Sequence, residues 1–436
     1  MDKPVGIVNN QEDKWGWVVA TACFCINFII LGLQRSAAIV YVALLAEFGI
    51  TREQAAWPIT LCSSIMFLVG PLAGFLAQFL IIKTIVFTGC LIASIGVILC
   101  FFGHSLVFII LFFGAVQGFG NGLVITLNPV IINQYFKKHK ATASGIAYAG
   151  ASVGSIALPP FTEYLLDEYN LRGCFLLLGG IILQGLVAAS LYRPPKSVTR
   201  KIGNVPEIEQ LMKPQEQMDS RNIELSSKSK NFFIDGLRGT LDVITHPSFL
   251  IICVNYTSFF ICYIAFAMVF VDFSLDRGIE ESNATFCISA FSVGDLFGRL
   301  FTGWLSDFGY IKTKYLVTVN LLTMGILLLI FPIFSSYVII VILSILIGLL
   351  TGCILIIFPV LMTEYLGLQR LAMAMGFSGF TLGCTSLALP NLIGIFRDIV
   401  GTYDHLFHTL GLMAITSSLL WLLQPIYKIC KKKLFI

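Results

Sequence analysis

Residues 291–307 read FSVGDLFGRLFTGWLSD, an apolar stretch that carries Asp295 and Arg299 four residues apart. On an α-helix this spacing places both side chains on one face. The hydrophobic stretches around it are long enough to cross a bilayer, so both charges are expected inside a membrane-spanning helix. Ionisable groups at that depth are costly and usually face a bundle interior or a water-filled cavity. The pair therefore marks a candidate functional site.

The composition indicates a membrane protein along the whole chain. Hydrophobic residues make up 57% and charged residues only 12%, whereas soluble domains carry about 25% charged residues. Cys23 and Cys25 form a C-x-C pair without the further ligands that a metal site needs. The chain has no G-x-x-x-x-G-K-[ST] phosphate loop, so ATP-driven transport is not expected. We expect no cofactor, no metal and no nucleic-acid partner.

Hydrophobic segments of about 18 residues or more fall into two sets of six. They lie near 16–44, 55–80, 84–102, 106–132, 141–166 and 172–192, and near 247–271, 283–308, 314–334, 337–363, 370–397 and 404–428. The predicted fold is an all-α membrane protein with twelve transmembrane helices in two six-helix halves.

The polar segments divide the chain into five parts. A short N-terminus and an N-terminal bundle precede a polar linker, which a C-terminal bundle and a basic tail follow; the predicted ranges are 1–14, 15–192, 193–246, 247–428 and 429–436. Lysine and arginine gather on the side of the linker and both ends. The opposite side holds only Arg52, Arg172, Arg277 and Arg397. Because positive charge marks the inner side of a membrane, both termini are expected in the cytosol.

The two halves repeat one another in sequence. The matched pairs include Gly145 with Gly376, Ser155 with Ser386, Pro159 with Pro390, and Gly74 with Gly303. Parallel repeats related by an axis along the membrane normal are the internal symmetry of major-facilitator carriers. In such carriers the substrate site lies between the halves near mid-membrane.

Several motifs resemble one family. Trp15-Gly16-Trp17, residues 135–154 (YFKKHKATASGIAYAGASVG), residues 401–407 (GTYDHLF) and the span with Asp295 and Arg299 are similar to the monocarboxylate transporter family of the major facilitator superfamily. Residues 303–307 (GWLSD) resemble the superfamily's loop motif, which is degraded to GFLAQ at 74–78. The resemblance implies a symporter of the plasma membrane. Some members need a single-span immunoglobulin-type partner, and the sequence leaves open whether this chain does.

Arg35 is the third charge within a span, and it departs from the family. Counting from Trp17, it falls where proton-coupled lactate carriers have a lysine. A desolvated lysine can lose its proton, whereas an arginine stays charged. Two routes remain open: Asp295 carries the proton alone, or transport is facilitative. Arg35 and Arg299 carry two positive charges, and an ionised Asp295 carries one negative charge. The net charge of +1 favours an anionic substrate, whose carboxylate a guanidinium can bind through a fork of two hydrogen bonds.

Further site residues are implied by the family resemblance alone. Phe67, Ser144 and Phe358 fall near its substrate-pocket positions, and Lys140 and Asp307 near its gate. For each there is also a plainer interpretation. Aromatic and serine side chains in a span usually pack against helices, and loop lysines set orientation and contact lipid headgroups.

The leading hypothesis is a secondary transporter that moves a small organic monocarboxylate, with or without protons, by alternating access. The alternative is a facilitative carrier of zwitterions or larger organic molecules, such as amino acids or creatine. A third, more remote hypothesis is a sensor that binds its ligand without transporting it. A fourth, an intramembrane aspartyl protease, rests on a distant likeness at Gly294-Asp295 and Tyr403-Asp404. We do not expect an enzyme.

Overall fold

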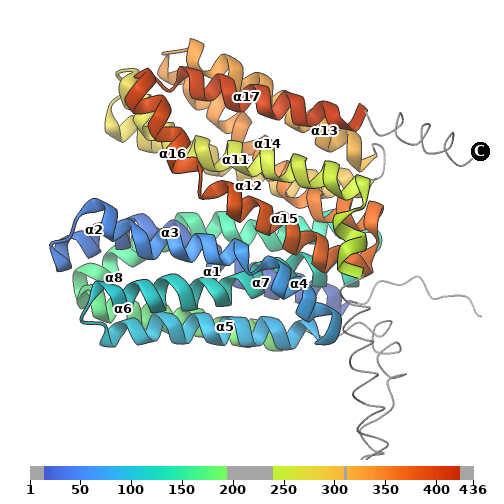
Figure 1. The fold of residues 1–436 in the computed structure, drawn as a ribbon, viewed down its shortest axis with the longest axis horizontal. Coiled ribbons are helices and arrows are strands. Elements are labelled where there is room, and N and C mark those ends of the chain that lie inside the picture. Colours follow the sequence, from blue (N-terminus) through green and yellow to red (C-terminus); the bar gives the residue numbers. More distant parts are fainter. Residues whose placement is uncertain (1–13, 194–238, 309–311, 423–436) are drawn as a thin grey trace, which may run out of the picture.

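The computed structural model describes residues 14–193, 239–308 and 312–422, which are almost entirely helical. Figure 1 shows the first half in blue to green. Its helices are α1 (Trp15–Arg35), α2 (Ala37–Phe48), α3 (Arg52–Leu68), α4 (Gly70–Phe79), α5 (Ile82–Leu99), η1 (Cys100–Phe102), α6 (Leu106–Ile109), η2 (Ile110–Val116), α7 (Gln117–Tyr135) and α8 (Lys140–Ser190).

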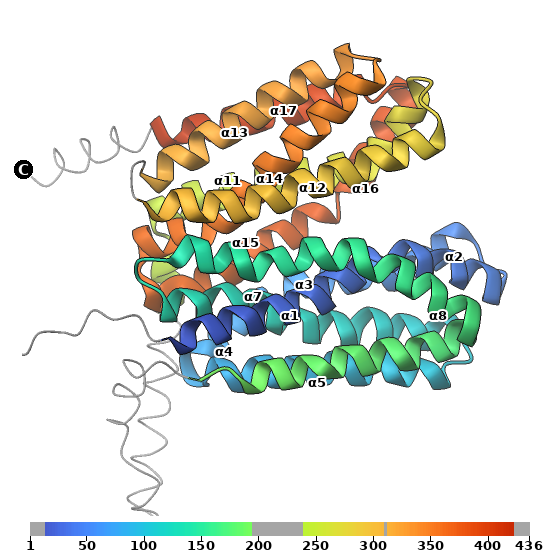
Figure 2. The same cartoon turned by 180° about the vertical axis from the view of Figure 1, so that it is seen from behind.

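Local chemistry explains the breaks in this half. The first span is interrupted at Ser36, which separates α1 from α2. The second bends by 41° between α3 and α4, where Gly70 is followed by Pro71 in the first turn of α4. Within α8, Asn170 has φ 57° and ψ 176°, which are not helical angles. At that residue the chain reverses direction, so α8 holds two antiparallel crossings (Figure 2).

The second half has the same layout. Its helices are α11 (Pro247–Asp276), α12 (Glu281–Asp307), α13 (Thr313–Ile330), η4 (Phe331–Ile333), α14 (Tyr337–Leu366), η5 (Leu368–Arg370), α15 (Leu371–Ser386), α16 (Leu389–Gly394), η6 (Ile395–Val400), α17 (Asp404–Leu419) and η7 (Leu420–Leu422).

The prediction of twelve spans is confirmed. In the described part of the chain, eight helices are long and apolar enough to cross a membrane, and the bent α3–α4 pair makes nine. One of the eight is α8, which crosses twice. The other two crossings are α12, whose charges lower its hydropathy, and α17, which is only 16 residues long. The predicted linker falls mostly at 194–238, outside the described residues, as do 1–13 and 423–436, so the predicted domain boundaries stay predictions.

The two halves lie one above the other in both views (Figures 1 and 2). They meet at the end where α1 begins, and they diverge toward the end where α2 and α16 lie. We call the first of these the basic end, because its helix ends and connecting segments carry Lys83, Lys138, Lys312 and Arg370. Two pairs of helices bring the halves together there: α8 with α12, and α4 with α15. We call these contacts the α8–α12 seam and the α4–α15 seam.

Candidate functional site

Asp295 and Arg299 form a two-pronged ion pair on α12. Arg299 Nε donates to Asp295 Oδ1 at 3.0 Å, and a second guanidinium nitrogen lies 2.8 Å from Oδ2. Both residues are buried, with 6% and 5% of their surface exposed. A parallel fork of this kind is a strong form of charged hydrogen bond. The spacing seen in the sequence therefore becomes a tight intrahelical pair.

The same pair also bonds to the other half of the molecule. Ser152 Oγ on α8 donates to Asp295 Oδ2 at 2.7 Å. Arg299 donates from its other terminal nitrogen to the carbonyl oxygen of Tyr148 at 2.6 Å. In this conformation each of the three guanidinium nitrogens therefore contacts Asp295 or the Tyr148 carbonyl. The prediction that Arg299 binds substrate stays a prediction, and it requires these bonds to open.

Small residues allow this buried pair to form. A Cβ added at Gly145 on α8 would overlap the carbonyl oxygen of Arg299, so only glycine lets the two helices approach this closely. On the other side of α12, Gly348 and Gly352 of α14 lie against the backbone of Phe291 and Asp295 in the same way. Close backbone approach through small residues is typical of helix packing in membranes.

Arg35 lies in very different surroundings. It is the last residue of α1, directly before the break at Ser36, and it is exposed. Its guanidinium carbon lies 5.4 Å from the ring centroid of Tyr263 on α11, in the other half. Although its side chain keeps exposed surface, the surrounding protein desolvates its charge, and Asp295 and Arg299 interact with it electrostatically. The structure thus brings the three predicted charges into one electrostatic group between the halves.

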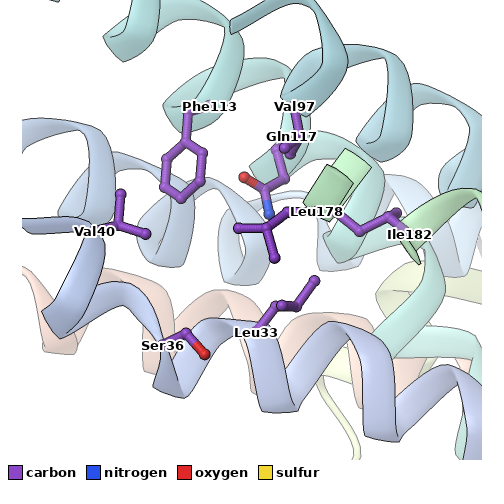
Figure 3. Close-up of a pocket in the computed structure, with 8 residues that line it drawn as sticks. All are labelled: Leu33, Ser36, Val40, Val97, Phe113, Gln117, Leu178 and Ile182. Carbon is purple, nitrogen blue, oxygen red and sulfur yellow. The ribbon is translucent and has the colours of Figure 1, made fainter. Parts of the chain in front are cut away.

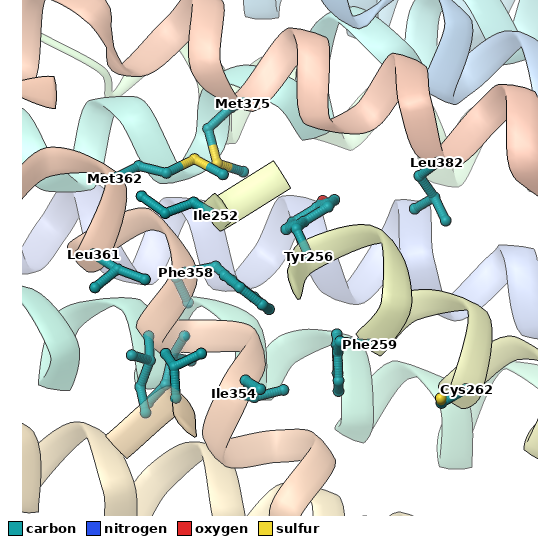
Figure 4. Close-up of a cluster of buried hydrophobic side chains, with 14 of the residues drawn as sticks. Ile252, Tyr256, Phe259, Cys262, Ile354, Phe358, Leu361, Met362, Met375 and Leu382 are labelled. Atoms are coloured by element: carbon teal, nitrogen blue, oxygen red, sulfur yellow. The ribbon is translucent and has the colours of Figure 1, made fainter. Parts of the chain in front are cut away.

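The three predicted pocket residues differ in their surroundings. Phe67 on α3 is half-buried and lies against Gly383 of α15, across the seam between the halves. Phe358 is fully buried, and its ring lies 5.2 Å from Tyr256 and 5.9 Å from Phe259 (Figure 4). Ser144 is buried, and its hydroxyl has no hydrogen-bond partner in the described part of the chain.

The two predicted gate residues lie together at the basic end. The carboxylate of Asp307 on α12 accepts from the backbone N–H groups of Ala141 at 3.0 Å and Thr142 at 2.7 Å, in the first turn of α8. A carboxylate at a helix N-terminus is stabilised by the helix dipole. Lys140 is attracted electrostatically to Glu364 and Asp307. These contacts link the two halves across the α8–α12 seam.

A small cavity lies next to the break in the first span. It measures about 10 Å³ and is lined by residues of α1, α2, α5, η2, α7 and α8 (Figure 3). Two of its polar atoms, Ser36 Oγ and Gln117 Oε1, are buried without a hydrogen-bond partner in the described residues. The volume suffices for about one water molecule. It is far too small for an organic substrate.

The structure also shows a polar network that the sequence reasoning missed. Asn27 on α1 donates to the carbonyl of Ala147 at 2.9 Å and accepts from Asn128 on α7 at 3.0 Å. Tyr192 donates to Asn128 at 2.9 Å. All of these side chains are buried. The network links α1, α7 and α8, which favours movement of the first half as one body.

Ser152 and Tyr148 were missed too, although the sequence held a signal for them. With Ser144 they are spaced by four residues, which places all three on one face of α8. A polar face on a predicted span would have indicated a helix directed toward a functional partner. Nothing in the sequence pointed to Asp295 as that partner.

The carboxylates named in the protease hypothesis do not meet. Asp404 lies at the start of α17 and pairs with Arg277 at 2.6 Å, whereas Asp295 is occupied by Arg299 and Ser152. An aspartyl protease dyad requires two carboxylates in contact. The described contacts of both residues are inconsistent with such a dyad.

Comparison with known proteins identifies the family. The model of the Major Facilitator Superfamily matches residues 23–380 and 248–428, so the chain belongs to this superfamily. The E. coli fucose:proton symporter FucP superposes with a TM-score of 0.68 at 14% identity, covering 93% of this chain and 98% of that one. The proton:xylose symporter XylE gives 0.68 at 11% identity, with 94% and 96% covered.

The predicted resemblance within the superfamily is confirmed as well. Monocarboxylate transporter 12-B of Danio rerio is 27% identical, covering 99% of this chain and 91% of that protein. Monocarboxylate transporter 2 of Rattus norvegicus is 28% identical, with 94% and 82% covered. Monocarboxylate transporter 9 of Mus musculus is 28% identical, with 98% and 96% covered. The chain is therefore a multi-pass secondary transporter of small organic molecules and not an enzyme.

Proposed function

We propose that the chain carries a small organic monocarboxylate by alternating access, with Arg35 as the residue that receives the carboxylate. One observation carries this proposal. Arg35 is exposed although it lies between the two halves, opposite Tyr263 and within the electrostatic reach of Asp295 and Arg299. An exposed guanidinium can offer its fork to a carboxylate. The relatives named as monocarboxylate transporters support the same substrate class.

In this proposal the Asp295–Arg299 pair is the switch. It is bonded to Ser152 and Tyr148 of the other half, so the halves cannot separate at this level without breaking those bonds. A proton on Asp295 would remove the charge that holds Arg299. A substrate carboxylate would compete for the same guanidinium. Either event weakens the contact between the halves, and proton coupling in this chain rests on Asp295 because Arg35 stays charged.

We further propose that the basic end faces the cytosol and that the carrier works at the plasma membrane with both termini inside. The basic residues in its turns support this orientation. The bonds from Asp307 to Ala141 and Thr142 would then close the carrier toward the cytosol. A single-span immunoglobulin-type partner stays an implication of the family resemblance. Surface labelling with and without such a partner would test it.

A second candidate is a facilitative carrier of zwitterions, and the aromatic surroundings of Arg35 favour it. The ring of Tyr263 is parallel to that of Phe259 to within 5° and to that of Phe291 to within 20°, at centroid distances of 6.3 Å and 6.2 Å. Aromatic faces attract ammonium groups. A substrate with both a carboxylate and an amine would then bind Arg35 and the neighbouring ring together.

Uptake of labelled lactate, pyruvate, creatine and aromatic amino acids at external pH near 6 and near 8 tests both candidates. We expect carboxylate uptake by the natural chain and its loss in Arg35→Ala. Arg172→Ala is the matched control, because Arg172 is an exposed arginine beside His104, next to the reversal of α8 at Asn170. Uptake of zwitterions alone, independent of pH, would favour the second candidate. Unchanged carboxylate uptake in Arg35→Ala would remove Arg35 from the site.

A further inference from the structure

The two seams at the basic end are related by the sequence repeat but differ in chemistry. Gly303 on α12 and Gly74 on α4 are repeat partners, and each lies against the backbone of the opposite half, at Ala141 and Ala372 respectively. The two halves have different residue types at the fourth position after each glycine. Asp307 supplies a carboxylate to the α8–α12 seam, whereas the α4–α15 seam has the neutral Gln78.

The α4–α15 seam contains a cavity of about 290 Å³. One wall belongs to the first half and includes Gln78 of α4 and Gln134 of α7. The other wall belongs to the second half and includes Gln369 of η5 and Ala372 of α15. Gln78 and Gln369 are exposed, so the cavity opens toward the aqueous side. Its volume is close to the lower limit for small-molecule sites.

The polar side chains that line this cavity are three glutamines. The side chains of Gln78, Gln134 and Gln369 make no hydrogen bond or ion pair within the described residues. Each primary amide offers two N–H donors and one acceptor. Three such groups from both halves therefore converge on one space with their donors free.

The charges beside the cavity favour an anion. Ile82 of the lining is followed by Lys83, whose ammonium donates to the carbonyl of Ser190 at 2.7 Å, and Gln369 is followed by Arg370. Among the described residues, the carboxylate of Asp242 lies 3.5 Å from Arg370. Two cations and one carboxylate give the surroundings of the cavity a net positive charge. In the α8–α12 seam, the corresponding place is filled by the carboxylate of Asp307.

We propose that this cavity binds a small carboxylate anion from the aqueous phase at the basic end, and that the bound anion holds the two halves together. It would do in the α4–α15 seam what Asp307 does in the α8–α12 seam. Because both walls contribute amides, the site exists only while this end is closed. Binding there stabilises the closed state and slows its opening. The site is separate from Arg35 and does not depend on which substrate is carried.

Thermal unfolding of the purified full chain in succinate tests the proposal, with succinamide at equal ionic strength as the uncharged control. We expect succinate to raise the Tm by about 2 °C or more and succinamide to leave it unchanged. The shift should disappear in the double variant Gln78→Leu and Gln369→Leu. It should persist in Arg35→Ala, which separates this cavity from the proposed substrate site.

A second variant keeps the test decisive if the leucine variants do not fold. Gln78→Glu places a carboxylate of the chain itself in the cavity. It should raise the Tm without any ligand and abolish the further rise with succinate. An equal effect of succinamide, a shift that survives Gln78→Glu, or loss of the shift in Arg35→Ala would each overturn the proposal.

Discussion

The two intramembrane arginines lie in opposite surroundings. Arg299 is buried, and all three of its guanidinium nitrogens contact Asp295 or the Tyr148 carbonyl. Arg35 is exposed and has an aromatic ring as its described neighbour, at 5.4 Å. A buried charge must be paired to be tolerated, whereas an exposed one is available to a ligand. This difference indicates that Arg299 holds the two halves together and that Arg35 receives the substrate.

Removing Arg299 should have the largest effect of any single change at the site. Arg299→Ala leaves Asp295 buried without its cation, which costs about 3–5 kcal/mol. We expect little folded protein at the cell surface and a much lower Tm in detergent. A variant that folds and reaches the surface at normal levels would show that the pair is not needed for stability.

Arg35→Ala should have the opposite phenotype, because Arg35 is exposed. We expect normal surface expression and a loss of carboxylate uptake. A charged hydrogen bond contributes about 1.5–3 kcal/mol, which corresponds to roughly a 10- to 100-fold rise in KM. Arg35→Lys should retain carboxylate binding and steepen the dependence on pH, because a lysine can titrate. Poor folding of both Arg35 variants would contradict the contrast between Arg35 and Arg299.

Asp295→Asn separates the proton-binding role of Asp295 from its packing role. The amide keeps the shape of the carboxylate but can neither carry its negative charge nor take up a proton. If Asp295 is the proton carrier, the ratio of uptake at the two pH values should fall to near one. Asp404→Asn is the matched control, since Asp404 at the start of α17 pairs with Arg277, which follows the last residue of α11. A steep pH profile in Asp295→Asn would place the proton elsewhere.

The smallest expected effect is that of Ser152→Ala. It removes one hydrogen bond to Asp295 from the other half, which costs about 1.5–3 kcal/mol for a charged acceptor. We expect a modest fall in Tm and easier separation of the halves. Ser155→Ala is the control, because the Ser155 hydroxyl donates to the carbonyl of Ser152 within its own helix. Equal behaviour of the two variants would argue against a bond that links the halves.

Sequence reasoning identified the charges but not their partners. Asp295, Arg299 and Arg35 stand out because charge is rare in apolar segments, and the four-residue spacing places the first two together. Ser152 and Tyr148 escaped notice because serine and backbone carbonyls are common in spans. Their role depends on which helix packs against α8, and that is a long-range contact.

The pocket residues taken from family resemblance show the same limit. Phe358 is fully buried among aromatic side chains of its own half, while Phe67 lies at the seam between the halves. Sequence alone treats two phenylalanines in spans alike. Their exposure depends on helix rotation and on how far the halves have separated.

By itself, the sequence determined the number of spans, their division into two related halves and the rarity of charge within them. These follow from hydropathy and periodicity, which are local properties of the chain. Only the tertiary structure decided that Arg299 is buried and paired with Asp295 while Arg35 is exposed, and that the α8–α12 seam is closed by a carboxylate while the α4–α15 seam leaves a cavity. The reason is physical: pairing and exposure depend on neighbours from distant segments, and the packing of the helices selects those neighbours.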